Sequence, residues 1–236
     1  MATKHPTPHV AAGMPTGALH PVASSRLNKP AGRPDMVAVG TWVWLASELM
    51  FFAALFAAYF SIRNVTNSAA AAAGTESLWQ QSTQHLNFTF AGINTIILVL
   101  SSVTCQMGVH AAEHYRVRRE GSIFQILKWG MREWYTLTFV MGAVFVAGQL
   151  TEYFELFSEG FNIATNSYWS AFFLATGFHG LHVFGGLIAF LFVIGRSFMA
   201  RTYTHEQSVA AMVVSYYWHF VDVIWIVLFA VLYILK

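Results

Sequence analysis

The chain has 236 residues, of which 56% are apolar and only 10% are charged, and its mean hydropathy is +0.51. Soluble domains carry about 25% charged residues, so this composition excludes a soluble enzyme and indicates a membrane protein. The net charge of +2 gives no support for nucleic acid as a partner, and the single cysteine, Cys105, excludes an intrachain disulfide.

Residues 1–36 hold all six prolines and lack the continuous apolar core of a secretory signal, so we interpret them as a poorly ordered arm. Five later stretches each have the roughly 20 mostly apolar residues that cross a bilayer as a helix. They lie at about 37–62, 88–112, 134–157, 168–198 and 208–235. Polar residues and the run Ala69–Ala73 predict a surface loop between the first two. We therefore expect an all-α integral membrane protein, with a five-transmembrane-helix bundle over residues 37–236.

Basic residues predict the orientation of these spans. With the N-terminus in the cytoplasm, 11 of the 13 Lys and Arg residues lie inside, and only Arg63 and Lys236 lie outside. The C-terminus is then outside. Tyr168 and Trp169, which open the fourth span, are expected to act as interfacial anchors at the outer face.

Glu48 lies about 16 Å into the first span, roughly halfway across, at 1.5 Å per residue from Val37. An ionisable group at this depth is costly and is a functional candidate by default. Two interpretations are open. The carboxyl either bonds to a neighbouring helix as a structural contact or takes part in proton traffic.

Three histidines and a second carboxylate also lie at membrane depth. His179 and His182 are three residues apart in the fourth span, and His219 and Asp222 are three apart in the fifth, so each pair shares a helix face. Such a set could build a metal site or supply haem ligands. We favour an interhelical hydrogen-bonded network with no metal, in which Glu48 and Asp222 are partners of the imidazoles. Gly180, beside the imidazoles, is expected to permit close helix contact.

Further polar side chains lie near the span ends, where they can reach water. Gln149 and Glu152 end the third span near the outer surface, and a solvated interfacial role is the expectation for both. The same holds for the inner set at the end of the second span: Gln106, His110, Glu113 and His114. No hydrolase, zinc-protease or phosphate-loop motif is present.

Four segments in order resemble subunit III of the haem–copper terminal oxidases. They are Ser-Glu-Leu-Met-Phe-Phe from Ser47, Gln-Leu-Thr-Glu-Tyr from Gln149, Ala-Thr-Gly-Phe-His-Gly-Leu-His-Val from Ala175 and Tyr-Trp-His-Phe-Val-Asp-Val-Ile-Trp from Tyr217. The resemblance covers residues 37–236 and implies an all-helical subunit beside the catalytic subunit, without haem or copper of its own.

The resemblance also implies roles for particular residues. Glu48 matches the family's carbodiimide-reactive carboxyl, and Arg196 matches a position implicated in binding a lipid headgroup, with bound phospholipid a recurrent feature. The implied role is accessory: support of assembly, proton uptake and stability of the catalytic subunit in a proton-pumping cytochrome c oxidase. The expected partners are oxidase subunit I as the main contact, subunit II, anionic phospholipid and, in a respiratory supercomplex, a cytochrome bc complex.

This chain has five spans where mitochondrial-type members have seven, and the missing two are the first. The family's five-span form indicates a bacterial plasma membrane. Alternatives within the family are subunit III of a quinol oxidase or of a nitric oxide reductase system. Outside it, the alternatives are a proton or ion transporter using the buried polar groups and a b-type cytochrome ligated by the histidines. No proline interrupts any span and no internal repeat is visible, which speaks against a transporter.

Overall fold

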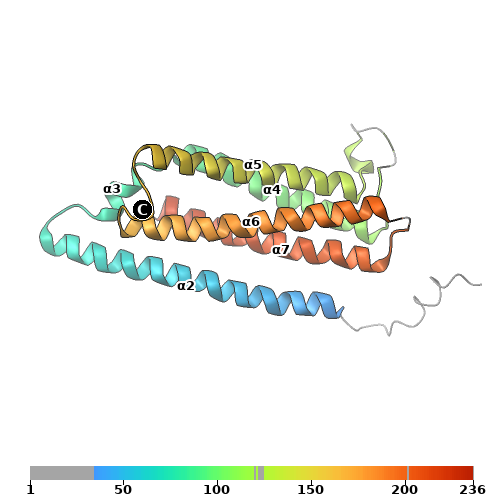
Figure 1. The fold of residues 1–236 in the computed structure, drawn as a ribbon, viewed down its shortest axis with the longest axis horizontal. Helices are drawn as coiled ribbons and strands as arrows, with labels where there is room; N and C mark the ends of the chain where they lie inside the picture. The colour runs from blue at the N-terminus through green and yellow to red at the C-terminus, as the bar shows by residue number, and fades with distance from the viewer. Residues whose placement is uncertain (1–34, 120, 122–124, 201, 236) are drawn as a thin grey trace, which may run out of the picture. The chain divides into compact units, whose positions relative to one another are not determined.

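The computed structural model describes residues 35–119, 121, 125–200 and 202–235, and within them the chain is helical (Figure 1). A π-helical turn, Ala230–Ile234, continues the last long helix, and the connections hold a short helix and a 3₁₀ turn, Ile126–Lys128. The predicted arm falls outside the described residues, except for Asp35 and Met36. The helices are α2 (Met36–Ala73), α3 (Leu78–Thr83), α4 (Phe88–Glu113), α5 (Met131–Ser158), α6 (Ser167–Met199) and α7 (His205–Phe229).

In the described part of the chain, five helices are long and apolar enough to cross a membrane: α2, α4, α5, α6 and α7 with its π-helical extension. The shortest, α4, has 26 residues. At 1.5 Å per residue it is about 39 Å long, which exceeds a hydrocarbon core of about 30 Å. The prediction of an all-helical chain with five long apolar helices is confirmed.

The first long helix continues past its predicted end, so the expectation of a surface loop from residue 63 is wrong for residues 63–73. Alanine is the best helix former, and the run Ala69–Ala73 lets α2 continue beyond the apolar segment. The helix ends at Gly74, whose left-handed backbone (φ 67°) is the usual C-terminal cap. Its backbone N–H bonds the carbonyls of Ala70 and Ala71.

The long helices pack as neighbours in a bundle (Figure 1). α5 packs against α4 and α6, and α7 packs against the same two helices. α2 lies along α6 and α7 and presents a single buried stripe to them: Thr41, Leu45, Phe52 and Tyr59. Spacings of four and seven residues keep this stripe on one face of the helix. Glu48 falls in the same stripe, between Leu45 and Phe52.

Two glycines accommodate one of the fully buried tryptophans of the bundle, Trp218. A Cβ built on Gly142 would lie 2.6 Å from the Trp218 indole, and one on Gly186 would lie 2.9 Å from it. The indole Nε1–H donates to Ser101 Oγ at 2.9 Å. A Cβ on Gly180 would meet nothing within 4 Å, so the expected role of Gly180 in close helix contact is wrong.

Tyr168 and Trp169 do not act as interfacial anchors, because both are fully buried in the protein. The short helix α3 brings Trp79 against Tyr168, with the two rings edge-on at a centroid distance of 5.2 Å. Trp79 also donates its Nε1–H to the Tyr59 hydroxyl at 2.7 Å, which ties α3 to α2. The ring cluster therefore closes one end of the bundle.

Replacing Gly142 by alanine will destabilise the bundle by about 1–3 kcal/mol, because the added methyl overlaps the Trp218 ring in a packed interior. Thermal unfolding of the purified protein measures the effect. The matched control is Gly180→Ala, whose methyl meets open space and whose helix propensity improves. Equal melting temperatures for the two variants would contradict this account of the interior.

Candidate functional site

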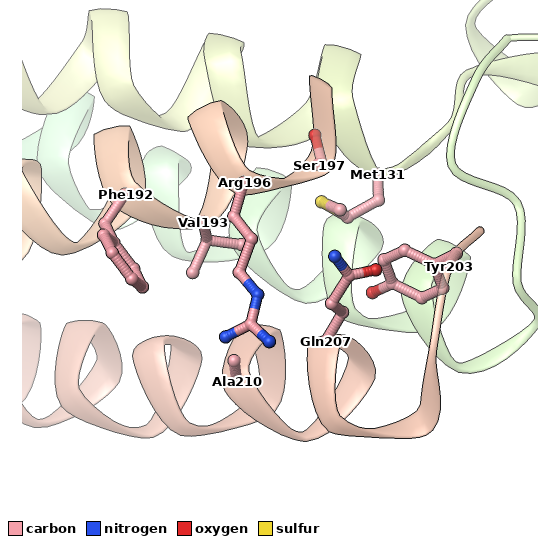
Figure 2. A pocket seen from close by; sticks show the side chains of 8 residues that line it. All are labelled: Met131, Phe192, Val193, Arg196, Ser197, Tyr203, Gln207 and Ala210. Carbon is pink, nitrogen blue, oxygen red and sulfur yellow. The ribbon is translucent and has the colours of Figure 1, made fainter. Parts of the chain in front are cut away.

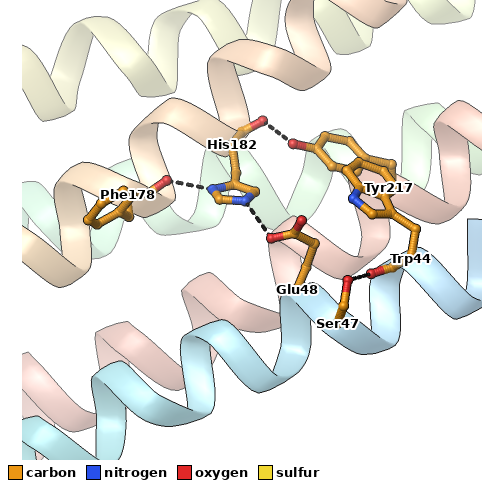
Figure 3. A network of polar contacts seen from close by, with 6 residues as sticks. All are labelled: Trp44, Ser47, Glu48, Phe178, His182 and Tyr217. Carbon is orange, nitrogen blue, oxygen red and sulfur yellow. Dashed lines mark hydrogen bonds and ion pairs between the residues drawn. The ribbon is translucent and has the colours of Figure 1, made fainter.

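Glu48 makes an interhelical contact at membrane depth. Its Oε2 lies 3.2 Å from Nε2 of His182 on α6, and the two side chains are 23% and 18% exposed (Figure 3). The position of Glu48 in the packed stripe of α2 directs the carboxyl toward α6 and α7. The structure thus brings together one carboxylate and one imidazole of the predicted polar set.

The hydrogen bonds of His182 restrict where its protons lie. Its Nδ1 is 2.7 Å from the Phe178 carbonyl oxygen, and a carbonyl only accepts, so Nδ1 carries a proton. A neutral imidazole then has a bare Nε2, which cannot donate to Glu48. The contact is a hydrogen bond only if a further proton lies between Glu48 and His182. A hydrogen bond at this contact therefore requires one proton shared by the Glu48 carboxyl and His182 Nε2.

Aromatic rings surround this pair. The Tyr217 hydroxyl donates to the His182 carbonyl oxygen at 2.8 Å, and the Trp44 ring stacks on Tyr217 with centroids 5.3 Å apart (Figure 3). Phe52 packs edge-on against the imidazole at 5.0 Å. These contacts connect α2, α6 and α7 and leave the imidazole little freedom to rotate.

His179 is oriented differently from His182, although the two share a helix face. It is fully buried, and its Nε2 lies 3.1 Å from the carbonyl oxygen of Val221 on α7, so it donates there. Its Nδ1 has no hydrogen-bond partner among the described residues. His179 bonds the Val221 carbonyl and His182 bonds the Phe178 carbonyl. The two imidazoles therefore do not converge on a common ligand.

His219 and Asp222 belong to a second network, between α4 and α7. Ser102 Oγ donates to Asp222 Oδ2 at 2.8 Å and lies 3.3 Å from His219 Nδ1. His219 Nε2 is 3.3 Å from Gln106 Oε1. Ser102 was not among the predicted polar residues, and Gln106 was expected in a solvated role near the inner surface rather than in a network with His219. Their spacing of four residues along α4 is the signal that could have placed them on one face.

Gln149 and Glu152 are not solvated, so that expectation is wrong: each is only 5% exposed. The Tyr233 hydroxyl donates to Glu152 Oε1 at 2.6 Å, and Gln149 Nε2 donates to Oε2 at 3.3 Å. The cause is the π-helical turn after α7, which places Tyr233 over the carboxylate. This third network joins α5 to the end of the chain.

Arg196 lies in the last turn of α6, and its guanidinium extends toward Ala210 on α7 (Figure 2). Its Nη2 is 3.9 Å from a carboxylate oxygen of Glu206, and both side chains are largely exposed. Because this ion pair is long and solvent-exposed, it is weak, and the guanidinium can still bind another anion. Burial raises the pKa of nearby Tyr203 to about 12, so its hydroxyl stays protonated.

These features define a class of protein: a multi-pass membrane protein whose buried carboxyl and imidazole groups are engaged in hydrogen bonds between helices. Among residues 35–119, 121, 125–200 and 202–235, no group of three or more His, Cys, Asp or Glu side chains could hold a metal ion.

The family model of cytochrome c oxidase subunit III matches residues 33–236. A probable cytochrome c oxidase subunit 3 of Mycobacterium tuberculosis (strain ATCC 25618 / H37Rv) is 52% identical over 204 residues, which cover 86% of this chain and 90% of the relative. Cytochrome c oxidase subunit 3 of Corynebacterium diphtheriae is 48% identical, and the match again covers 86% of this chain and 90% of the relative. Cytochrome c oxidase subunit 3 of Thermostichus vulcanus is 39% identical, and the match covers 86% of this chain and 89% of the relative.

The chain therefore belongs to the cytochrome c oxidase subunit III family and is a subunit of the oxidase complex. The resemblance inferred from the four motifs is confirmed. Membership implies other oxidase subunits as partners, and the family generally lacks redox cofactors.

Replacing His182 by leucine will destabilise the packing of α2 by about 1–3 kcal/mol, because the Glu48 carboxyl then lacks a partner at membrane depth. Glu48→Gln is the matched variant, since its amide N–H still donates to Nε2 and should cost less than about 1 kcal/mol. Thermal unfolding of each purified variant gives the comparison. A glutamine variant as unstable as the leucine variant would refute the shared hydrogen bond.

Proposed function

We propose that this subunit is the cofactor-free accessory subunit of a proton-pumping cytochrome c oxidase in aerobic respiration, and that it supports assembly, proton uptake and stability of the catalytic subunit. The observation that carries the proposal is the contact of Glu48 Oε2 with His182 Nε2 at 3.2 Å, which places a carboxyl and an imidazole where they can share a proton between α2 and α6. Cytochrome c as electron donor is favoured over quinol because the relatives named above are cytochrome c oxidase subunits.

The proposed membrane is the bacterial plasma membrane, with the N-terminus in the cytoplasm and the C-terminus outside. Bacterial relatives support the location. The described basic side chains support the orientation, because the end of α4, the start of α5 and the end of α6 lie at one end of the bundle and carry five arginines: Arg116, Arg118, Arg119, Arg132 and Arg196. Arg63, near the far end of α2, would lie outside.

Anionic phospholipid is the proposed ligand of Arg196. The planar guanidinium suits a phosphate diester, and the long contact with Glu206 leaves its donors available. Phe192 lines the adjoining hollow, is 65% exposed and would contact an acyl chain. Oxidase subunit I is proposed as the main protein contact, with subunit II and, in a supercomplex, a cytochrome bc complex as further partners.

Replacing Glu48 by glutamine will slow proton uptake or shorten the catalytic lifetime of the oxidase by a few-fold, with haem content and subunit composition unchanged. The amide keeps the hydrogen bond and removes the exchangeable proton. Oxygen consumption followed until the enzyme inactivates, together with proton uptake by reconstituted vesicles, measures both quantities. The control is Glu76→Gln, which alters an exposed carboxyl in a connection. If the Glu48→Gln oxidase showed wild-type proton uptake and catalytic lifetime, the proposed role of Glu48 in proton uptake would be contradicted.

Replacing Arg196 by alanine will reduce the anionic phospholipid that co-purifies with the oxidase, because the bidentate donor is lost. Lipid mass spectrometry per oxidase complex is the measurement. Arg116→Ala removes a charge at the same end of the bundle and serves as the control. Equal lipid loss in both variants would indicate general charge attraction and would overturn the assignment to Arg196.

A further inference from the structure

One outward face of the bundle carries polar side chains at membrane depth. Gln106 on α4 is exposed, and His219 on α7 is about half-buried. Gln106 lies seven residues before the end of α4, about 10 Å along the axis, and Ser102 lies about 16 Å along it. Because α4 is about 39 Å long and the hydrocarbon layer is about 30 Å thick, both residues lie within that layer.

The polar groups of this face have unused hydrogen-bonding capacity. The amide of Gln106 has two donor hydrogens and two acceptor lone pairs, and its contact with His219 uses only one of these four. Behind it, Asp222 Oδ1 is buried and has no partner among the described residues. An amide that faces lipid with unmet donors costs free energy, so such groups normally face protein.

Apolar side chains flank the polar centre on both helices. Val103 on α4 is 59% exposed, and Val223 on α7 is 58% exposed. Each lies within four residues of a polar member, Gln106 or His219. A helix of another protein that covers this face would therefore bury valine side chains and meet the amide and imidazole at the centre.

We propose that this α4–α7 face, made of Ser102, Val103, Gln106, His219 and Val223, docks a transmembrane helix of another oxidase subunit. The partner helix carries a hydroxyl or amide side chain at the depth of Gln106 and His219 and hydrogen-bonds there. The proposal uses the membership of this chain in the oxidase, which supplies the other subunits. Lipid acyl chains cannot satisfy the amide, whereas a polar side chain on a neighbouring helix can.

Photochemical cross-linking in the assembled oxidase tests which molecule covers the face. Val103→p-benzoylphenylalanine places the photoreactive group on it, and Cys105, the neighbouring native thiol, is buried and left unchanged. The expected product after irradiation is a covalent adduct of this chain with another oxidase subunit, identified by mass spectrometry of its peptides. An adduct with lipid alone, or with a second copy of this chain, overturns the proposal.

The matched control is Ile188→p-benzoylphenylalanine on α6. Ile188 is 53% exposed and lies 11 residues before the end of α6, the same depth as Ser102 in α4. Lipid adducts are expected there. If the Ile188 variant cross-linked to another subunit and the Val103 variant cross-linked only to lipid, the docking face would lie elsewhere on the bundle. Absence of other oxidase subunits from the purified complex would instead contradict the proposed function.

A second experiment tests the hydrogen bond. Gln106→Leu keeps the size of the side chain and removes its donors and acceptors, so the complex should dissociate in detergent about 3- to 30-fold more readily, the range for one interhelical hydrogen bond in a membrane. Met107→Leu, a neighbouring apolar exchange, should leave dissociation unchanged. Equal retention of the partner subunit in Gln106→Leu and wild type contradicts a polar contact at this face.

Discussion

The structure depends on one constraint: inside the hydrocarbon layer, a polar group must find its partner within protein. The backbone meets this constraint by forming helices. Side chains meet it by bonding between helices, as Glu48 does with His182 and as Glu152 does with Tyr233. Each bond joins two different helices, so satisfying the side chains also determines which helices are neighbours and how each is rotated about its axis.

The attachment of α2 illustrates the consequence. Of its 38 residues only four are buried, all in one stripe, so apolar packing alone would allow the helix to slide or rotate. The Glu48–His182 contact fixes its depth against α6, and the Tyr59–Trp79 hydrogen bond fixes its far half against α3. The carboxyl that is the leading candidate for proton chemistry is therefore also a structural contact. The two interpretations of Glu48 refer to the same contact with His182, since a hydrogen bond there requires a shared proton.

Properties that depend on single segments could be predicted from the sequence, and properties that depend on pairs of helices could not. Five apolar stretches and a carboxyl at mid-span follow from local composition and length. The close approach of Trp218 to Gly142 depends on which helices meet, and the position of Gly180 beside the imidazoles had suggested that glycine instead. The burial of Glu152 likewise depends on Tyr233, which is 81 residues away in the chain. Local propensity could have extended α2, since the run Ala69–Ala73 favours helix. The mostly polar residues 63–68 before that run ended the apolar stretch that predicts a membrane span.

The three polar networks differ in how completely the chain satisfies them, and this difference separates internal contacts from external ones. Glu152 has both carboxylate oxygens bonded and is shut inside the bundle, and Glu48 is held between helices with limited exposure. The network of Ser102 and Asp222 begins inside the bundle but ends on Gln106, at the surface of α4. A chain selected to exist alone in lipid would have no reason to place an amide there. A subunit selected to function in a complex does, because the free energy that Gln106 loses in the isolated chain is regained on assembly and favours the assembled state.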